Sequence, residues 1–176
     1  MKKNIGLLDI KPAEKEALRR MLAPVKEPQA VNFEQLVWVK DIIHTITPWV
    51  PDQSEAETIA RWVYVYAKHF KLSPELVLAV IAVESQFDHF AVSNVGAIGL
   101  MQVMPFWKNE LGKSTDNLLK IETNVRYGCA ILHHYIGRYK TLPRALAAYN
   151  GSLGRNKYPN KVFAKMKQFK ATNTDS

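Results

Sequence analysis

A chain of 176 residues, 47% of them hydrophobic, is long enough to bury one core and too apolar to be mostly disordered. Its formal net charge of +8 favours an anionic partner, such as nucleic acid, acidic lipid or a negatively charged cell-wall polymer, without choosing among them. The single cysteine, Cys129, excludes an intrachain disulfide, and its apolar helical surroundings favour core packing over a nucleophilic role. Long segments with helical periodicity and no sustained alternation predict an all-α fold.

The first fifty residues predict short helices and a linker. Residues 12–22 have the periodicity of a short amphipathic helix, and prolines interrupt the linker candidate at 23–29. Asn32 is placed to cap a second helix, which should end before Pro48. The apolar run behind Met1 is too short for a secretion signal, and no stretch is long enough to span a membrane. We therefore expect either a signal removed beforehand or export by another route.

A third helix is predicted by a Ser-x-x-Glu pattern. Such a pattern, here Ser54 to Glu57, is typical of a capping box, in which the serine closes the first turn. The apolar positions that follow carry this helix to about Phe70. Together with the helices before it, it should cover a core that later segments build.

The next helix carries one carboxylate on its apolar side. Ser73 is a good N-cap and Pro74 suits the first helical position, where its missing N–H is not needed. Val77, Ile81 and Glu84 share one helical face, because they follow the i, i+4, i+7 spacing. Glu84 therefore projects where an apolar residue is expected.

Two interpretations of Glu84 follow from this position. Burial disfavours the ionised form, and the C-terminal end of a helix is partly negative, so both effects should keep the proton on Glu84 to a higher pH than on a free side chain. A carboxyl of that kind can act as a general acid. The alternative is that Glu84 caps a neighbouring helix or pairs with a buried Arg or Lys, as most charges near a core do.

A glycine-containing loop follows this helix. Gly96 and Gly99, within 88–99, suit a tight loop whose backbone closely approaches another group, and residues 100–105 should form a short helix or turn. Phe106 and Trp107 add aromatic surface. Aromatic rings beside polar amides suit a sugar-binding groove, and they equally suit an ordinary core edge.

The remaining segments predict three more helices. A polar turn over 116–124 should lead into a helix over 125–139. An alanine-rich helix over 142–149 should stop at Gly151, which supplies a left-handed residue. A basic helix is expected over 160–169.

The sequence offers no metal-binding pattern. His133 and His134 are adjacent, so on a helix they point in different directions and cannot form a pair of ligands on one face. We expect both at the surface or at the edge of a groove. No other group of His, Cys, Asp or Glu has the spacing of metal ligands, and no cofactor is implied.

Four ordered motifs resemble the family 1 soluble lytic transglycosylases, whose SLT catalytic domain is lysozyme-like and related to goose-type lysozyme. The motifs are Glu84-Ser-Gln-Phe, Ala91-Val-Ser with Gly96-Ala-Ile-Gly-Leu-Met-Gln-Val-Met-Pro105, Asn124-Val-Arg-Tyr-Gly128 and Ala147-Ala-Tyr-Asn-Gly151. The resemblance covers about residues 53–170. It implies an all-α, lysozyme-like catalytic domain over 51–170. Outside the resemblance, the residues themselves predict an N-terminal helical extension and linker over 1–50 and a frayed tail over 171–176.

The resemblance implies cleavage of the β-1,4 bond between N-acetylmuramic acid and N-acetylglucosamine in peptidoglycan without water. Glu84 would protonate the leaving oxygen and then act as base on the muramoyl C6 hydroxyl, which attacks its own C1 and leaves a 1,6-anhydro end. Glycosidases that use water or a protein nucleophile need two carboxylates. Asp88 is the only near candidate for a second one, and we interpret it as a residue that orders the helix end or the loop.

The resemblance also implies substrate-binding residues. Ser85 would order the surroundings of the acid, and the other expected contacts are Ser93, Met101, Gln102, Tyr149, Asn150 and Tyr158. Met101 and Gln102 would line the glycan groove, and Tyr149 with Asn150 would orient the substrate or the catalytic carboxyl. Here the sequence departs from the commonest family pattern, because Gly-Ser-Leu-Gly follows Asn150 and the connection to Tyr158 is short.

Other classes of function stay open. A hydrolase of the same architecture, similar to goose-type lysozymes, would need a second acid, and a non-catalytic wall-binding or assembly protein of a secretion or phage-tail machine could keep the fold. A nucleic-acid binder is disfavoured, because no basic recognition helix with interleaved polar readers is present. The expected partner is the peptidoglycan glycan strand, with a monomeric protein in the periplasm or at the cell envelope, where peripheral association and contact with envelope machinery are expected.

Overall fold

The computed structural model describes residues 10–26 and 32–172. Within these ranges the chain forms eight helices and no strand, which confirms the all-α prediction. The helices are α1 (Pro12–Met21), α2 (Phe33–Ile46), α3 (Gln53–His69), α4 (Pro74–Ser85), α5 (Phe106–Leu111), α6 (Ile121–Arg138), α7 (Leu142–Asn150) and α8 (Lys157–Thr172). The apolar run behind Met1, residues 27–29 of the expected linker and residues 173–176 of the expected tail lie outside the described residues.

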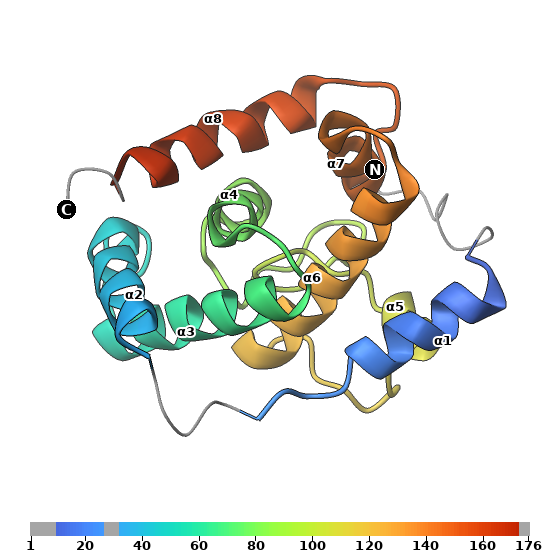
Figure 1. Ribbon diagram of the computed structural model, residues 1–176, viewed down its shortest axis with the longest axis horizontal. Coiled ribbons are helices and arrows are strands. Elements are labelled where there is room, and N and C mark those ends of the chain that lie inside the picture. Colours follow the sequence, from blue (N-terminus) through green and yellow to red (C-terminus); the bar gives the residue numbers. More distant parts are fainter. Residues whose placement is uncertain (1–9, 27–31, 173–176) are drawn as a thin grey trace.

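Helix α4 is the centre of the fold. Figure 1 shows it enclosed by α2, α3, α6, α7 and α8, and it packs directly against α3 and α8. Seven consecutive residues, from Leu76 to Ala82, are buried, so the helix is covered on all sides and not on one stripe. Each large aliphatic side chain buried there stabilises the fold by about 1.5–3 kcal/mol. Glu84, in the last turn, therefore lies at the edge of the core.

Both ends of α4 have local causes. The Ser73 hydroxyl accepts a hydrogen bond from the Leu76 N–H at 3.3 Å, as an N-cap does. After Ser85 the backbone turns left-handed at Gln86 and Phe87, with φ of 52° and 64°. That conformation costs roughly 1–2 kcal/mol per non-glycine residue. The Phe87 ring, 1% exposed between Trp49 and Phe169, offsets the cost and stops the helix at Ser85.

The start of α3 differs from the predicted capping box. Asp52 is the N-cap, and its carboxylate accepts from the Glu55 N–H at 2.7 Å. Ser54 lies inside the first turn, so the predicted Ser54–Glu57 box is wrong. A charged Asp caps at least as well as Ser and also interacts favourably with the positive end of the helix dipole.

Two later helices begin earlier than predicted. Helix α6 starts at Ile121, which places Asn124 inside the helix and not in a turn before it. Helix α8 starts at Lys157, so Tyr158 belongs to its first turn, followed by a buried Pro159. Proline is tolerated in a first turn because the N–H it lacks would have no partner there.

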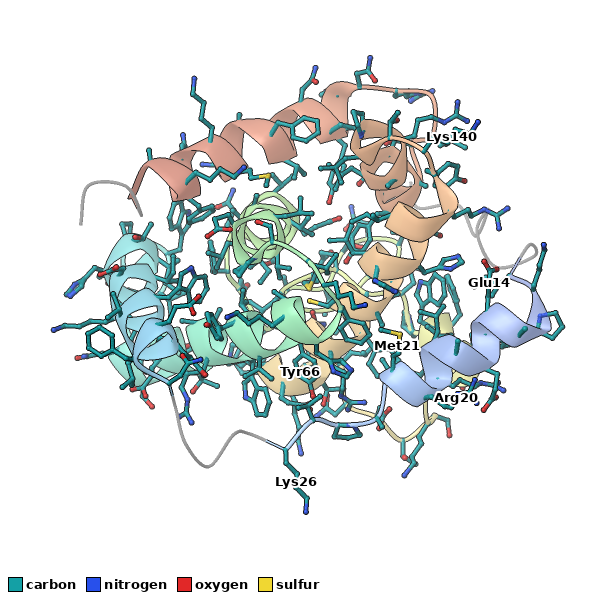
Figure 2. The ribbon with its side chains drawn as sticks, viewed as in Figure 1. Glu14, Arg20, Met21, Lys26, Tyr66 and Lys140 are labelled. Atoms are coloured by element: carbon teal, nitrogen blue, oxygen red, sulfur yellow. The ribbon has the colours of Figure 1, made fainter. Side chains whose placement is uncertain are left out.

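The N-terminal helices pack on the rest of the chain. Helix α1 contacts α5 and α6, and α2 contacts α3 and α8. Behind α1, the Arg126 guanidinium donates to the Leu22 carbonyl at 2.8 Å, and the Tyr66 hydroxyl accepts from the Val25 N–H at 3.3 Å. Figure 2 shows Tyr66 on the side of α3 that faces this segment, near Met21. No described helix combines the length and hydrophobicity that crossing a bilayer requires.

His134 is buried, so its expected place at the surface or a groove edge is wrong. Its side chain is 6% exposed, and its Nε2 has no hydrogen-bond partner among the described residues. Burial lowers the pKa of the imidazole below 6.5, and the charges of Arg138 and His133 lower it further against the opposing effect of Glu14. The folded protein therefore keeps His134 neutral where an unfolded chain would protonate it.

Acid should destabilise the protein through this histidine. The unfolded state binds a proton as the pH falls through about 6.5 and the folded state does not, so the free energy of unfolding decreases below that pH. His134→Leu should reduce the decrease, which urea unfolding at pH 7.5 and 5.0 measures. His44→Gln, at an exposed histidine, is the matched control and should keep the wild-type pH dependence. Identical pH dependence in His134→Leu and wild type would contradict the interpretation.

Candidate active site

Glu84 receives a hydrogen bond from a residue far along the chain. The Tyr158 hydroxyl donates to Glu84 Oε1 at 3.0 Å across the contact between α4 and α8. Glu84 is half-buried and Tyr158 is 7% exposed. The last turn of α4 thus carries the carboxyl group, and the first turn of α8 supplies the hydroxyl that binds it.

Two tyrosine hydroxyls near Glu84 stay protonated. Burial raises the pKa of Tyr158 well above 10.0, and the negative charge of Glu84 raises it further. The same two causes, in the same order, raise the pKa of Tyr149. Both hydroxyls therefore keep their protons near neutral pH and can donate hydrogen bonds.

A pocket of about 350 Å³ opens beside Glu84. Its lining residues come from the end of α4, the end of α7, the following connection and the start of α8. They are Val83, Glu84, Asn150, Ser152, Arg155, Lys157, Tyr158 and Lys161. Glu84 is the one carboxylate among the described residues of this lining, and three of the others are cationic.

The loop after α4 folds back on itself. Ser93 makes two hydrogen bonds to Ala97: its N–H donates to the carbonyl at 2.9 Å and its hydroxyl accepts from the N–H at 3.0 Å. The Gly99 N–H donates to the Ala91 carbonyl at 2.8 Å. Gly99 has φ +74°, and a Cβ there would lie 2.4 Å from Asn124 Nδ2, so this close approach requires glycine.

Three side chains hold the backbone at Leu100 and Met101. The Ser85 hydroxyl donates to the Leu100 carbonyl at 2.8 Å, and the Tyr149 hydroxyl donates to the Met101 carbonyl at 2.7 Å. The Asn124 side-chain oxygen accepts from the Met101 N–H at 2.8 Å. These side chains come from α4, α7 and α6, so the loop is fixed relative to the helix that carries Glu84.

Some of the expected site residues lie together in the pocket lining, and others contact the loop after α4. Glu84, Asn150 and Tyr158 share the pocket lining, and Asn150 also donates to the Ser152 hydroxyl at 3.0 Å. Ser85 and Tyr149 bond to the loop backbone, as described above. Ser93 forms part of the loop turn and is half-buried.

Met101 and Gln102, which are expected to line the glycan groove, are both buried. Met101 is 0% exposed and packs so closely on Gly128 that a Cβ there would lie 2.3 Å from its sulfur. Gln102 is 6% exposed, and its amide donates inward to the Ala91 and Gly99 carbonyls at 3.2 and 3.1 Å. Of the aromatic pair, Trp107 is buried and belongs to the core.

Several residues of the site escaped the sequence reasoning. The sequence analysis predicts Asn124 in a turn, although an Asn inside an apolar helical pattern indicates a buried polar role. The pocket residues Ser152, Arg155, Lys157 and Lys161 were missed as well. Two sequence features could have indicated them: the departure from the family pattern after Asn150, and the basic residues among the last twenty positions.

The His, Cys, Asp and Glu side chains of the described part of the chain do not gather into a metal-binding group. No group of three or more His, Cys, Asp or Glu side chains there could hold a metal ion. Cys129 is fully buried, which confirms core packing, and burial raises the pKa of its thiol.

An all-α fold that encloses a buried central helix, with a glutamate in its last turn beside a pocket, defines the lysozyme-like class. The chain belongs to the family described as the transglycosylase SLT domain, which matches residues 62–171. The family resemblance drawn from the four motifs is therefore confirmed.

Known relatives cover parts of the chain. A transglycosylase of Enterobacteria phage PRD1 is 35% identical over 100 residues, 53% of this chain and 37% of the relative. The endo-type membrane-bound lytic murein transglycosylase A of Klebsiella pneumoniae is 30% identical over 103 residues, 51% of this chain and 49% of the relative. Membrane-bound lytic murein transglycosylase C of Actinobacillus pleuropneumoniae is 51% identical over 39 residues, 22% of this chain and 11% of the relative. The matches thus span half or less of each relative, and no solved structure matches.

Proposed function

We propose that the protein is a peptidoglycan lytic transglycosylase that cleaves the β-1,4 bond between N-acetylmuramic acid and N-acetylglucosamine and leaves 1,6-anhydro ends. One observation carries the proposal: Glu84 is the single carboxylate among the described residues that line the pocket. Retaining and inverting glycosidases need a second carboxyl group within about 5–9.5 Å. With one acid, the nucleophile has to come from the substrate itself.

In the proposed reaction the C6 hydroxyl of the substrate takes the place of water as the nucleophile. Glu84 gives its proton to the glycosidic oxygen as the bond from that oxygen to C1 breaks. The muramoyl C6 hydroxyl then forms a bond to C1, and its proton returns to the Glu84 carboxylate. The Tyr158 hydroxyl, which donates to Oε1, orients the carboxyl group for this transfer. Asn150 and Ser152 offer polar contacts for sugar hydroxyls in the same pocket.

The names of the relatives support this substrate. Two of them are called lytic murein transglycosylases and membrane-bound. A glycan strand with carboxylate groups suits a protein with a net charge of +8. Such a substrate lies in the cell envelope, so we propose that the protein acts there, in the periplasm or at its borders, as a monomer that contacts glycan strands.

Digestion of purified peptidoglycan sacculi tests the proposal. We expect mass spectrometry of the released fragments to find anhydro-muramoyl ends. Reducing ends would instead identify a hydrolase of the same architecture. No release, with the protein still sedimenting with sacculi, would identify a binding or assembly protein.

Tyr158→Phe should slow the reaction without unfolding the protein. The phenyl ring stays in place, and Glu84 loses one hydrogen bond. Because hydrogen bonds to charged groups contribute about 1.5–3 kcal/mol, kcat should fall roughly 10- to 100-fold. Initial rates of anhydro-end release and the melting temperature measure the two effects. Tyr139→Phe, at a half-buried tyrosine outside the pocket lining, is the matched control. A kcat within twofold of wild type in Tyr158→Phe would contradict the role in orienting Glu84.

A further inference from the structure

The pocket beside Glu84 has a cationic side. Arg155 lies in the connection between α7 and α8, and Lys157 and Lys161 lie one turn apart on α8, so the two lysines share one helical face. All three side chains are exposed, and none forms an ion pair with another described residue. Three positive charges therefore gather around one carboxylate and remain available to a ligand.

The backbone adds to the positive field at this place. Lys157 is the first residue of α8, a helix of 16 residues, whose N-terminus carries partial positive charge. Together these charges attract an anion into the pocket from solvent, and like-charge repulsion among the three side chains is relieved when the anion binds. If the three cations served only to interact with water, nothing would require all three to lie at the pocket that contains Glu84.

The proposed substrate carries anions close to the bond that is cleaved. Each muramoyl residue bears a lactyl ether on C3. Its carboxyl group is free in strands without peptides, and it is amide-linked in strands with peptides, which have carboxylates of their own. Both kinds of strand thus present a carboxylate near a sugar ring held at Glu84.

We propose that Arg155, Lys157 and Lys161 form a carboxylate-binding subsite, which selects muramoyl residues by their lactyl or peptide carboxylates and positions the adjacent glycosidic bond at Glu84. This rests on the proposed function. The three cations act on binding and specificity, and Glu84 alone transfers the proton. The subsite also gives the unusual Gly-Ser-Leu-Gly connection a role, because that segment places Arg155 on the pocket wall.

A triple variant, Arg155→Gln, Lys157→Gln and Lys161→Gln, tests the subsite with three substrates. They are naked glycan strands with free lactyl carboxylates, the same strands with these carboxylates converted to methylamides, and peptide-bearing strands. We expect the ratio of kcat/KM for naked strands over methylamide strands to fall roughly tenfold in the variant, mainly through KM, as the loss of exposed charge contacts implies. A parallel loss with peptide-bearing strands identifies peptide carboxylates as ligands too, and a loss confined to naked strands identifies the lactyl group.

A matched control removes the same charge elsewhere. Lys40, Lys140 and Lys167 are exposed and lie outside the pocket lining, and Figure 2 shows Lys140 just past the C-terminal end of α6. The triple Gln variant of these lysines should keep the wild-type ratio. In the wild type, added salt should lower kcat/KM more steeply for naked strands than for methylamide strands, because the contacts are exposed. An unchanged ratio in the pocket variant, or an equal loss in the control, would overturn the proposal.

Strand binding is measured in parallel by co-sedimentation, so that failure of the two proposals can be distinguished. If the wild type releases no anhydro ends from any strand, the proposed function fails. The subsite then still predicts tighter binding of naked than of methylamide strands, and loss of that preference in the pocket variant. Equal binding of both strands by the wild type would overturn the subsite whatever the reaction is. Melting temperatures of both triple variants close to wild type establish that they are folded.

Discussion

Glu84→Gln should abolish nearly all release of anhydro ends, with a rate loss of roughly 100- to 10,000-fold, the range over which general acid–base groups contribute. Glutamine has the shape of glutamic acid, and its side-chain oxygen can still accept the hydrogen bond from Tyr158. It has no proton to give to the leaving oxygen and cannot accept one from the C6 hydroxyl. The substitution therefore isolates proton transfer from the geometry of the site.

The fold should survive this substitution. Glutamine fills the same space and removes a half-buried charge, so the melting temperature should stay close to that of wild type or increase. Rates are measured on sacculi by mass spectrometry, and stability by thermal unfolding. A rate within tenfold of wild type would contradict the assignment of Glu84 as the acid, and a melting temperature well below wild type would contradict the expected stability of the variant.

Asp88→Asn is the matched control for Glu84→Gln. Asp88 is the nearest carboxylate in sequence, exposed, and its Oδ1 accepts from the Phe90 N–H at 2.9 Å. Asparagine keeps that acceptor, so we expect activity within about threefold of wild type. A loss as large as that of Glu84→Gln would mean that two carboxylates take part, and would favour a hydrolytic mechanism.

The features that the sequence predicted well have local causes. The start of α4 follows from Ser73 and Pro74 alone, and the left-handed Gly151, with φ 73°, ends α7 as expected. Such caps depend on neighbouring residues, which a sequence displays directly. Where two caps compete within three residues, as Asp52 and Ser54 do, local rules do not choose between them.

The features that the sequence missed depend on contacts between distant segments. Met101 and Gln102 follow a glycine-rich loop and were expected in a groove, but Gly128 on α6 leaves room for the Met101 side chain inside the core. The sequence predicts a basic helix over 160–169 but does not place its lysines near the acid. The packing of α8 on α4 brings Lys157 and Lys161 to the pocket of Glu84.

Asn124→Ala should be among the most destabilising single substitutions in the chain. The Asn124 side chain is buried, accepts from the Met101 N–H and donates to the Ile98 and Leu118 carbonyls, each at 2.8 Å. Alanine would leave one buried donor and two buried acceptors without this partner. At about 1–3 kcal/mol for each unsatisfied group, and allowing for relaxation, we expect a loss of about 3–5 kcal/mol in the free energy of unfolding.

Urea unfolding measures this loss, and Asn117→Ala is its matched control. Asn117 is exposed, and its side chain accepts from the Leu119 N–H at 3.0 Å, so its loss should cost about 1 kcal/mol or less. Equal costs for the two substitutions would contradict the role of Asn124 in holding the loop. The Asn124 variant should also lose activity at temperatures where it is still folded, because the backbone at Leu100 and Met101 is then held by two side chains instead of three.

Gly99→Ala extends the same argument to a pair of residues. The added Cβ would lie 2.4 Å from Asn124 Nδ2, so the clash in Gly99→Ala is partly with the very group that Asn124→Ala removes. The two substitutions should therefore be non-additive, and the double variant should be more stable than the sum of the single losses predicts, by roughly 1 kcal/mol or more. The left-handed φ of Gly99 and the nearby Leu118 carbonyl, at 2.8 Å from the Cβ, keep part of the cost in the double variant. Strict additivity would mean that the loop and α6 are not coupled through Asn124, and that the loop is positioned by Ser85 and Tyr149 alone.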